Sequence, residues 1–240
     1  MLPGIYDIFQ HWGQQSVWIY SDPHFSDEDL ECGIKNRPSD EVQIANINSC
    51  AGRKDTLIIL GDVGNLDCVR KLRAGRKVLI MGNHDSGATK YKRHQETVVL
   101  SVYDFSQEEA MEEMKRRYPG YQIHFECMGK AGWVFSIDNR LFDEVYEGAL
   151  MIGEKLILSH EPVDVPWAFN LHGHVHSRSF GQKSHHRHFN CCSDVIGYKP
   201  INLNQWLKQG YLANIQTIHR ETIDKATERK AKRGGKKLCQ

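Results

Sequence analysis

The stretch Leu171-His172-Gly173-His174-Val175-His176 places three imidazoles directly after an apolar run, Trp167-Ala168-Phe169-Asn170-Leu171, that is typical of a buried strand. Neutral imidazole is the commonest metal ligand in proteins, and a His-x-His pair on a loop can aim both rings at one region. Two histidines alone bind a metal only weakly. The stretch therefore predicts half of a metal site, whose other ligands must come from elsewhere in the chain.

The composition is that of an ordinary globular protein. The chain has 240 residues, of which 40% are hydrophobic and 25% charged, which suffices for one large domain with a buried core. A formal net charge of +1 gives no overall preference for polyanions. The seven cysteines show no Cys-x-x-Cys spacing, so neither a zinc knuckle nor a disulfide framework is indicated. Without a signal peptide pattern or a membrane-spanning apolar run, we predict a cytoplasmic protein that has no contact with a membrane.

Four other buried strands also end in residues that can bind a metal. The apolar run 17–20 leads into Asp22 and His24, and the run 56–60 leads into Asp62. The run 77–81 leads into Asn83, His84 and Asp85, and the run 155–158 leads into His160. Asp and Asn beside Gly or Pro are also frequent turn formers, so each motif taken alone is more often structural. Their repetition at the ends of successive strands favours one shared site.

Two further segments have alternative interpretations. Arg37 precedes a helix expected from Ser39 onward, with Val42 and Ile44 on its apolar face; its guanidinium is a candidate for binding a substrate phosphate, although a solvated surface role is commoner. Three histidines at 185, 186 and 188 alternate with cationic residues that would repel a metal, which favours a solvated loop.

We predict one domain over residues 1–222, with an insertion at 101–139, followed by a tail. The insertion begins with a helix signal at Ser106 and holds two candidate strands, 121–125 and 133–137. The tail, residues 223–240, is basic and has no apolar face, so we expect it to be disordered. It is either a solubilising segment or a source of phosphate contacts with nucleic acid.

The motifs together resemble those of the calcineurin-like metallophosphoesterases, above all the small phage and bacterial members. Residue types and order both match at Asp22-x-His24, Gly61-Asp62, Gly82-Asn83-His84-Asp85, His160 and Gly173-His174-x-His176. The resemblance implies an α/β fold, a four-layer sandwich of two mixed β-sheets flanked by helices. It also implies two divalent transition-metal ions bridged by Asp62. One metal would be bound by Asp62 together with Asp22, His24 and His176. The other would be bound by Asp62 together with Asn83, His160 and His174.

The implied chemistry is hydrolysis of a phosphoester by attack of a metal-bound hydroxide on phosphorus. His84 would protonate the leaving oxygen, and Asp85 would orient the ring of His84. The mixture of carboxylate, amide and imidazole ligands suits Mn, Fe, Zn or Ni without choosing among them. His172 falls outside the matching motif, so we expect it either to support the metal ligands indirectly or to have a purely structural role.

The resemblance leaves the substrate open. Protein Ser/Thr phosphatases of this superfamily carry an arginine that is missing here after Asp62, which disfavours that activity. We expect a phosphodiesterase or phosphomonoesterase acting on a small phosphorylated molecule or nucleotide. The alternatives are a nuclease, and a non-catalytic interaction scaffold, which the presence of His84 and of all seven ligands disfavours. Oligomeric state has no signature in the sequence.

Overall fold

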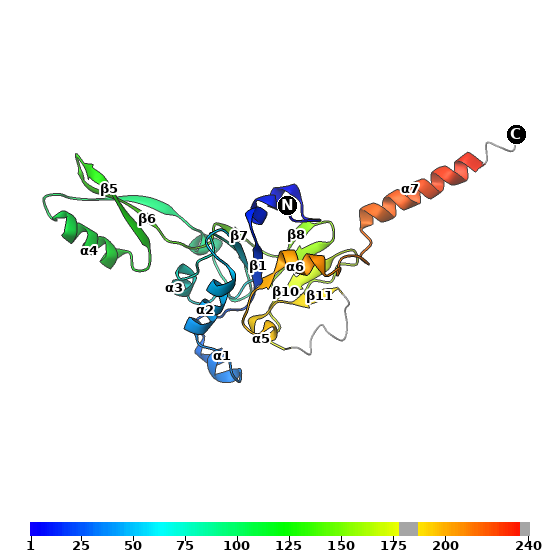
Figure 1. The fold of residues 1–240 in the computed structure, drawn as a ribbon, viewed down its shortest axis with the longest axis horizontal. Coiled ribbons are helices and arrows are strands. Elements are labelled where there is room, and N and C mark those ends of the chain that lie inside the picture. Colours follow the sequence, from blue (N-terminus) through cyan, green and yellow to red (C-terminus); the bar gives the residue numbers. More distant parts are fainter. Residues whose placement is uncertain (178–186, 236–240) are drawn as a thin grey trace.

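Two mixed β-sheets face each other in the computed structural model, which describes residues 1–177 and 187–235 (Figure 1). The first sheet has the strand order β12-β1-β2-β3-β7 and the second β11-β10-β9-β8. The strands of the first sheet are β1 (Val17–Tyr20), β2 (Thr56–Ile59), β3 (Arg76–Ile80), β7 (Glu144–Tyr146) and β12 (Ile201–Asn202). Those of the second are β8 (Leu150–Gly153), β9 (Leu156–Leu158), β10 (Phe169–His172) and β11 (His188–Asn190). β12 and β8 pair antiparallel with their neighbours, and the other pairings are parallel.

Alternate side chains of the first sheet belong to two different apolar cores. Ile58 and Leu60 face the second sheet, whereas Leu57 and Ile59 face the opposite way. A strand covered on both faces must be apolar at nearly every position, which is why the sequence shows continuous apolar runs here. The structure confirms the predicted α/β class with two mixed sheets and flanking helices.

Helices cover the outer face of the first sheet. α2 (Asp40–Cys50) contributes Ile44 and Ile47 to that core, and α3 (Leu66–Arg70) contributes Val69. The prediction that Val42 lies on the apolar face of α2 was wrong, because this side chain is 48% exposed. Its neighbour Gln43 is buried instead, because its side-chain oxygen accepts a hydrogen bond from the Tyr20 hydroxyl at 3.0 Å.

Short helical segments occupy the remaining connections. The first of them, η1 (Asp7–Gln14), buries Phe9 and Trp12 in the core between the sheets. No pattern in the sequence had predicted η1. The others are α1 (Glu28–Gly33), η2 (Ala88–Tyr91), α5 (Ser193–Ile196) and α6 (Leu203–Lys208).

The insertion is a small α/β unit that extends away from the two sheets (Figure 1). Its antiparallel sheet has the order β4-β6-β5, formed by β4 (Gln95–Leu100), β5 (Gln122–Gly129) and β6 (Gly132–Asp138). α4 (Gln107–Arg117) covers this sheet and begins with the capping box expected at Ser106. The unit thus starts at β4, before the predicted boundary of 101. β4 was not predicted because only the last three residues of that strand are apolar.

The C-terminal segment differs from its prediction. Residues 223–235 belong to α7 (Ile218–Gly235), a helix that projects from the body, where a disordered tail was expected (Figure 1). Ala, Glu, Lys and Arg are strong helix formers, and their propensity stabilises this helix without an apolar face. Residues 236–240 and the histidines at 185 and 186 lie outside the described residues. Within the described chain, no helix is both long and apolar enough to cross a membrane.

The insertion has an apolar core of its own, so its stability can be separated from that of the main sheets. Phe135 is fully buried in the insertion core, and Phe142 is fully buried under the first main sheet. We expect Phe135→Ala to lower the free energy of unfolding of the insertion by about 3–5 kcal/mol and to leave amide protection in β1 to β3 unchanged. Phe142→Ala should instead lower amide protection in β1 to β3 and leave that of the insertion unchanged. Hydrogen exchange measured by mass spectrometry distinguishes the two, and equal loss of protection everywhere would contradict the separation.

Candidate metal centre

Five loops bring the predicted site residues together at one end of the two sheets. β1, β2 and β3 run parallel, as do β9 and β10, so the carboxyl ends of neighbouring strands lie at the same edge. The loops that follow these strands carry the predicted ligands. They are Asp22 and His24, Asp62, Asn83, His160, and His174 with His176.

Left-handed backbone conformations aim several of these side chains. The φ angle is 55° at Asp22, 41° at His24, 52° at Asp62 and 65° at His174. Such conformations are uncommon for residues other than glycine and cost of the order of 1–3 kcal/mol each when the site is strained. Four of them in one site indicate that the surrounding packing holds the loops in a fixed geometry.

Asp22, His24 and Asp62 form one buried group of possible ligand atoms. Nε2 of His24 lies 3.4 Å from Oδ2 of Asp62 and has no hydrogen-bond partner, although it is buried. The other ring nitrogen, Nδ1, is 3.2 Å from the Asp27 carboxylate, which fixes the ring. A buried imidazole nitrogen left without a partner beside two carboxylates fits a position for a metal ion.

Asp62, His160 and His174 form a second group that shares Asp62 with the first. The side-chain oxygen of Asn83 is 2.8 Å from Nε2 of His160 and 3.1 Å from Nδ1 of His174. Nδ1 of His160 is 2.8 Å from the carbonyl oxygen of Leu60, to which it can donate a hydrogen bond. In that tautomer, Nε2 of His160 is free to bind a cation.

His176 lies beside the first group and is oriented by Asp194, which was not among the residues predicted from the sequence. Its Nδ1 is 2.6 Å from Oδ2 of Asp194, and its Nε2 is 3.8 Å from Oδ1 of Asp22. A histidine whose second nitrogen bonds a carboxylate is a common arrangement around protein metals. The Asp194 carboxyl is buried, which opposes ionisation, but its hydrogen bonds to His176 and Tyr198 hold its pKa at about 2. Cys192 is also within reach of His176 and Asp22.

Arg37 has a place that differs from both sequence interpretations. Its guanidinium is buried and donates to both carboxylate oxygens of Asp194, at 2.8 and 2.7 Å. It also donates to the carbonyl oxygens of Asp22 and Pro23. Because these acceptors occupy the guanidinium, Arg37 supports the ligand loops from behind, and the structure does not bring it to a substrate position.

Asp85 also differs from the role that the resemblance implied. Its carboxylate accepts backbone N–H groups of Asp62, Val63 and Gly82 at 2.9, 3.1 and 2.9 Å. Among the contacts of the described residues, none joins this carboxylate to the ring of His84. Asp85 therefore ties the Asp62 loop to the Asn83 loop. His84 is exposed, and its ring centroid lies 5.4 Å from that of His24.

Glycines allow the loops to approach closely. A Cβ added to Gly173 would lie 1.8 Å from Oγ of Ser21, and one added to Gly82 would lie 2.2 Å from Oδ1 of Asp62. His172 is buried; its Nδ1 is 2.9 Å from the Gly173 carbonyl oxygen, its ring lies 5.7 Å from that of His188, and burial lowers its pKa to about 4. These contacts fit the structural role, one of the two expected from the sequence.

The electrostatics of the cluster suit a cation. Burial would raise the pKa of Asp62, but hydrogen bonding by His160, the nearby ring of His24 and the backbone N–H of His84 hold it well below its ordinary value. Burial opposes ionisation of His160, yet its bond to Asp62 and the charge of Asp22 raise its pKa to about 9. At Asp22 burial prevails and raises the pKa. A divalent cation would neutralise these carboxylates and displace the His160 proton.

A site that gathers buried carboxylates and imidazoles at the strand ends of an α/β fold has a donor set that suits divalent metal ions. The family model for the calcineurin-like phosphoesterases matches residues 16–210, and the chain belongs to that family. It is therefore a hydrolase that depends on divalent metal ions. The crystal structure of a protein of unknown function from Aquifex aeolicus has a similar fold, with a TM-score of 0.50, 22% sequence identity, and coverage of 81% of this chain and 98% of that one. No curated protein matches the chain significantly.

The link between Asp194 and His176 can be tested through metal affinity. We expect Asp194→Asn to weaken metal binding by about 10–100-fold, because the amide no longer fixes the His176 ring as an ionised carboxylate does. Asp138→Asn is the matched control, since Asp138 is also a buried carboxylate paired with an arginine, Arg93. Calorimetric titration with Mn²⁺ measures both, each normalised to the folded fraction. Equal affinities in the two variants would contradict the role of Asp194.

Proposed function

We propose that the protein is a dinuclear phosphoesterase that hydrolyses phosphodiester or phosphomonoester bonds of a small phosphorylated molecule or nucleotide. The observation that carries this proposal is the meeting of two ligand groups at one shared carboxylate, Asp62. Dinuclear sites that act on phosphates hold their ions roughly 3.5–4 Å apart, a spacing that a bridging carboxylate suits. The partnerless Nε2 of His24 beside Asp62 supports the same interpretation.

The two proposed ligand sets follow the two groups. Asp22, His24 and His176 would hold one ion and Asn83, His160 and His174 the other, with Asp62 in both sets. Oxygen and imidazole ligands suit Mn, Fe, Zn or Ni. Bound in this way, two cations would acidify water and neutralise the charge of a phosphoryl group during in-line displacement.

His84 is the proposed general acid. It is exposed at the mouth of the cluster, and its backbone N–H donates to Oδ1 of Asp62 at 3.0 Å, which fixes the start of the side chain beside the metal ligands. An imidazole in that position can give a proton to the leaving oxygen of the ester. Asp85 supports it indirectly, through the backbone of the loop that carries both residues.

A nuclease is the second candidate, and one observation favours it. α7 exposes Arg229 and Lys230 on a helix that projects from the body, and Lys225 precedes them on the same helix. Cationic side chains of this kind make salt-sensitive contacts with nucleic-acid phosphates. The small-molecule proposal needs no such contact.

A substrate panel with a metal-site variant tests the proposal. We expect the wild-type protein to bind about two equivalents of Mn²⁺ and to hydrolyse a chromogenic phosphodiester, a chromogenic monoester, or both. Asp62→Asn should lose metal and activity together, whereas Asp104→Asn, an exposed change in the insertion, should keep both. Faster cleavage of single-stranded DNA or RNA than of either small ester would favour the nuclease. Full metal content and activity in Asp62→Asn would refute the dinuclear site.

The general acid is tested by a variant that keeps the metal site. His84→Asn should lower kcat by about 10²–10⁴-fold without changing metal content, because the loss is one of proton transfer. The loss should be smaller for an ester whose leaving group is already acidic, since that group needs no proton. His124→Asn, an exposed histidine on β5, is the control. An equal rate loss for acidic and basic leaving groups would argue against proton donation by His84.

A further inference from the structure

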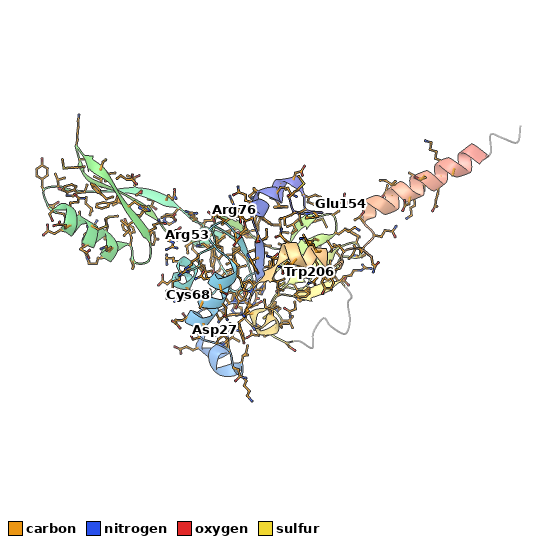
Figure 2. All side chains as sticks on the ribbon, in the orientation of Figure 1. Asp27, Arg53, Cys68, Arg76, Glu154 and Trp206 are labelled. Carbon is orange, nitrogen blue, oxygen red and sulfur yellow. The ribbon has the colours of Figure 1, made fainter. Side chains whose placement is uncertain are left out.

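A polar cavity lies at the opposite end of the first sheet from the metal centre. Its volume is about 660 Å³, and its lining includes residues from the segments that enter β2 and β3. The candidate ligands Asp62 and Asn83 follow the other ends of the same strands. Figure 2 shows the separation: Arg53 and Arg76 lie near one end of the sheet, and Asp27, the partner of His24, lies near the other. A strand of four or five residues spans roughly 13–17 Å, so one small ligand cannot fill both sites.

The lining of this cavity is strongly cationic. Six of its side chains are basic and none is acidic; they are Arg53, Lys71, Arg73, Lys77, Arg93 and Arg140. Only Arg93 is neutralised, through ion pairs with Asp138 and Asp143. Within the described part of the chain, no carboxylate forms an ion pair with the other five. Uncompensated charge of one sign in a concave surface concentrates the potential there.

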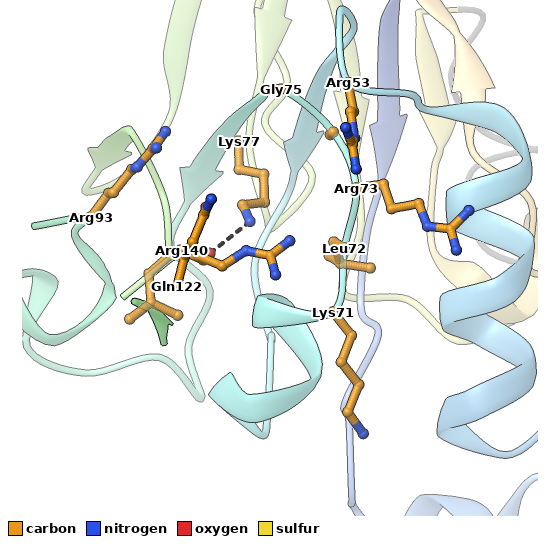
Figure 3. A pocket seen from close by; sticks show the side chains of 11 residues that line it. Arg53, Lys71, Leu72, Arg73, Gly75, Lys77, Arg93, Gln122 and Arg140 are labelled. Atoms are coloured by element: carbon orange, nitrogen blue, oxygen red, sulfur yellow. Dashed lines mark hydrogen bonds between the residues drawn. The ribbon is translucent and has the colours of Figure 1, made fainter. Parts of the chain in front are cut away.

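The cations converge from separate parts of the fold. Arg53 comes from the loop before β2, and Arg73 from the loop before β3. Arg140 comes from the chain that leaves the insertion. Figure 3 shows Arg53 and Arg140 directed toward the space above Leu72, whereas the side chains of Lys71 and Arg73 point away from that space. An anion between Arg53 and Arg140 would thus link the main body to the base of the insertion.

We propose that this cavity binds a compact oligophosphate anion, such as an inorganic triphosphate. Guanidinium groups present planar forks that match phosphate oxygens in two parallel hydrogen bonds. Several phosphate groups in a row can contact several of the five cations that form no ion pair. The lining contains no aromatic ring on which a base could stack, which favours a ligand without a base over a nucleotide or a nucleic acid.

Lys77, on the floor of the cavity, is consistent with an anion in this place. It is buried and donates to the carbonyl oxygens of Arg140 and Val69, at 2.6 and 3.4 Å. Burial first, and then the positive charge of Arg140, lower its pKa to about 8. A bound anion would favour the protonated amine and so raise this pKa.

Binding of sodium tripolyphosphate to the full-length chain tests the proposal. We expect saturable binding in calorimetry that weakens as salt rises, and a loss of affinity of about tenfold or more in the Arg53→Gln/Arg140→Gln double variant. The control, Lys130→Gln/Lys208→Gln, removes two exposed positive charges outside the lining and should bind as the wild type does. Asp62→Asn should also bind normally, since tripolyphosphate held by the metal centre would require Asp62. Arg73→Gln, a single change at the exposed rim, gives a smaller loss and guards against misfolding of the double variant.

Four results would overturn the proposal. One is the absence of binding by the wild type, and another is equal affinity in the wild type and the Arg53→Gln/Arg140→Gln variant. In the third, a single-stranded oligonucleotide binds more tightly than tripolyphosphate and depends on the same two arginines. That result would assign the cavity to a nucleic-acid backbone. The fourth is loss of tripolyphosphate binding in Asp62→Asn, which would place the anion at the metal centre. None of these results bears on the hydrolytic reaction, which the ester panel measures separately.

Discussion

The carboxylate of Asp62 is the group on which the geometry of the site depends. It is almost completely buried, and an ionised carboxylate in that position is unfavourable unless charged or hydrogen-bonding groups surround it. His24, His160 and the backbone N–H of His84 supply them. Each comes from a different loop, so the need to satisfy one charge fixes the relative positions of three chain segments. Asp85 then accepts backbone N–H groups from both the Asp62 loop and the Asn83 loop, which holds these two loops together.

A second layer of charge supports the opposite side of the site. Asp194 binds the ring of His176 on one side and the guanidinium of Arg37 on the other, and Arg37 in turn holds the carbonyl groups of Asp22 and Pro23. Breaking a buried pair of this kind leaves an unpaired charge, which commonly costs more than the pair contributes. The left-handed conformations of the first loop persist because this network fixes their backbone.

The sequence predicted the parts of the fold that depend on local pattern. Continuous apolar runs located β1, β2, β3, β9 and β10, and the polar residue types at their ends identified the ligand loops. Asp194 carried no such signal, because its role arises only when α5 packs against a loop about twenty residues earlier in the chain. The positions of Arg37 and Asp85 could not be read for the same reason: a guanidinium or carboxylate can bind backbone partners that no spacing encodes. β4 was missed because it is polar over half its length, and α7 because its stability comes from propensity.

The insertion has its own core, and only its base adjoins the main sheets. A unit that folds around separate side chains can change in length, shape or charge while the strand ends that carry the metal ligands stay as they are. Mutations there are consequently free of the constraints that the buried cluster imposes on the rest of the chain. Divergence among related proteins should therefore accumulate in this unit first, and with it differences in what each of them recognises.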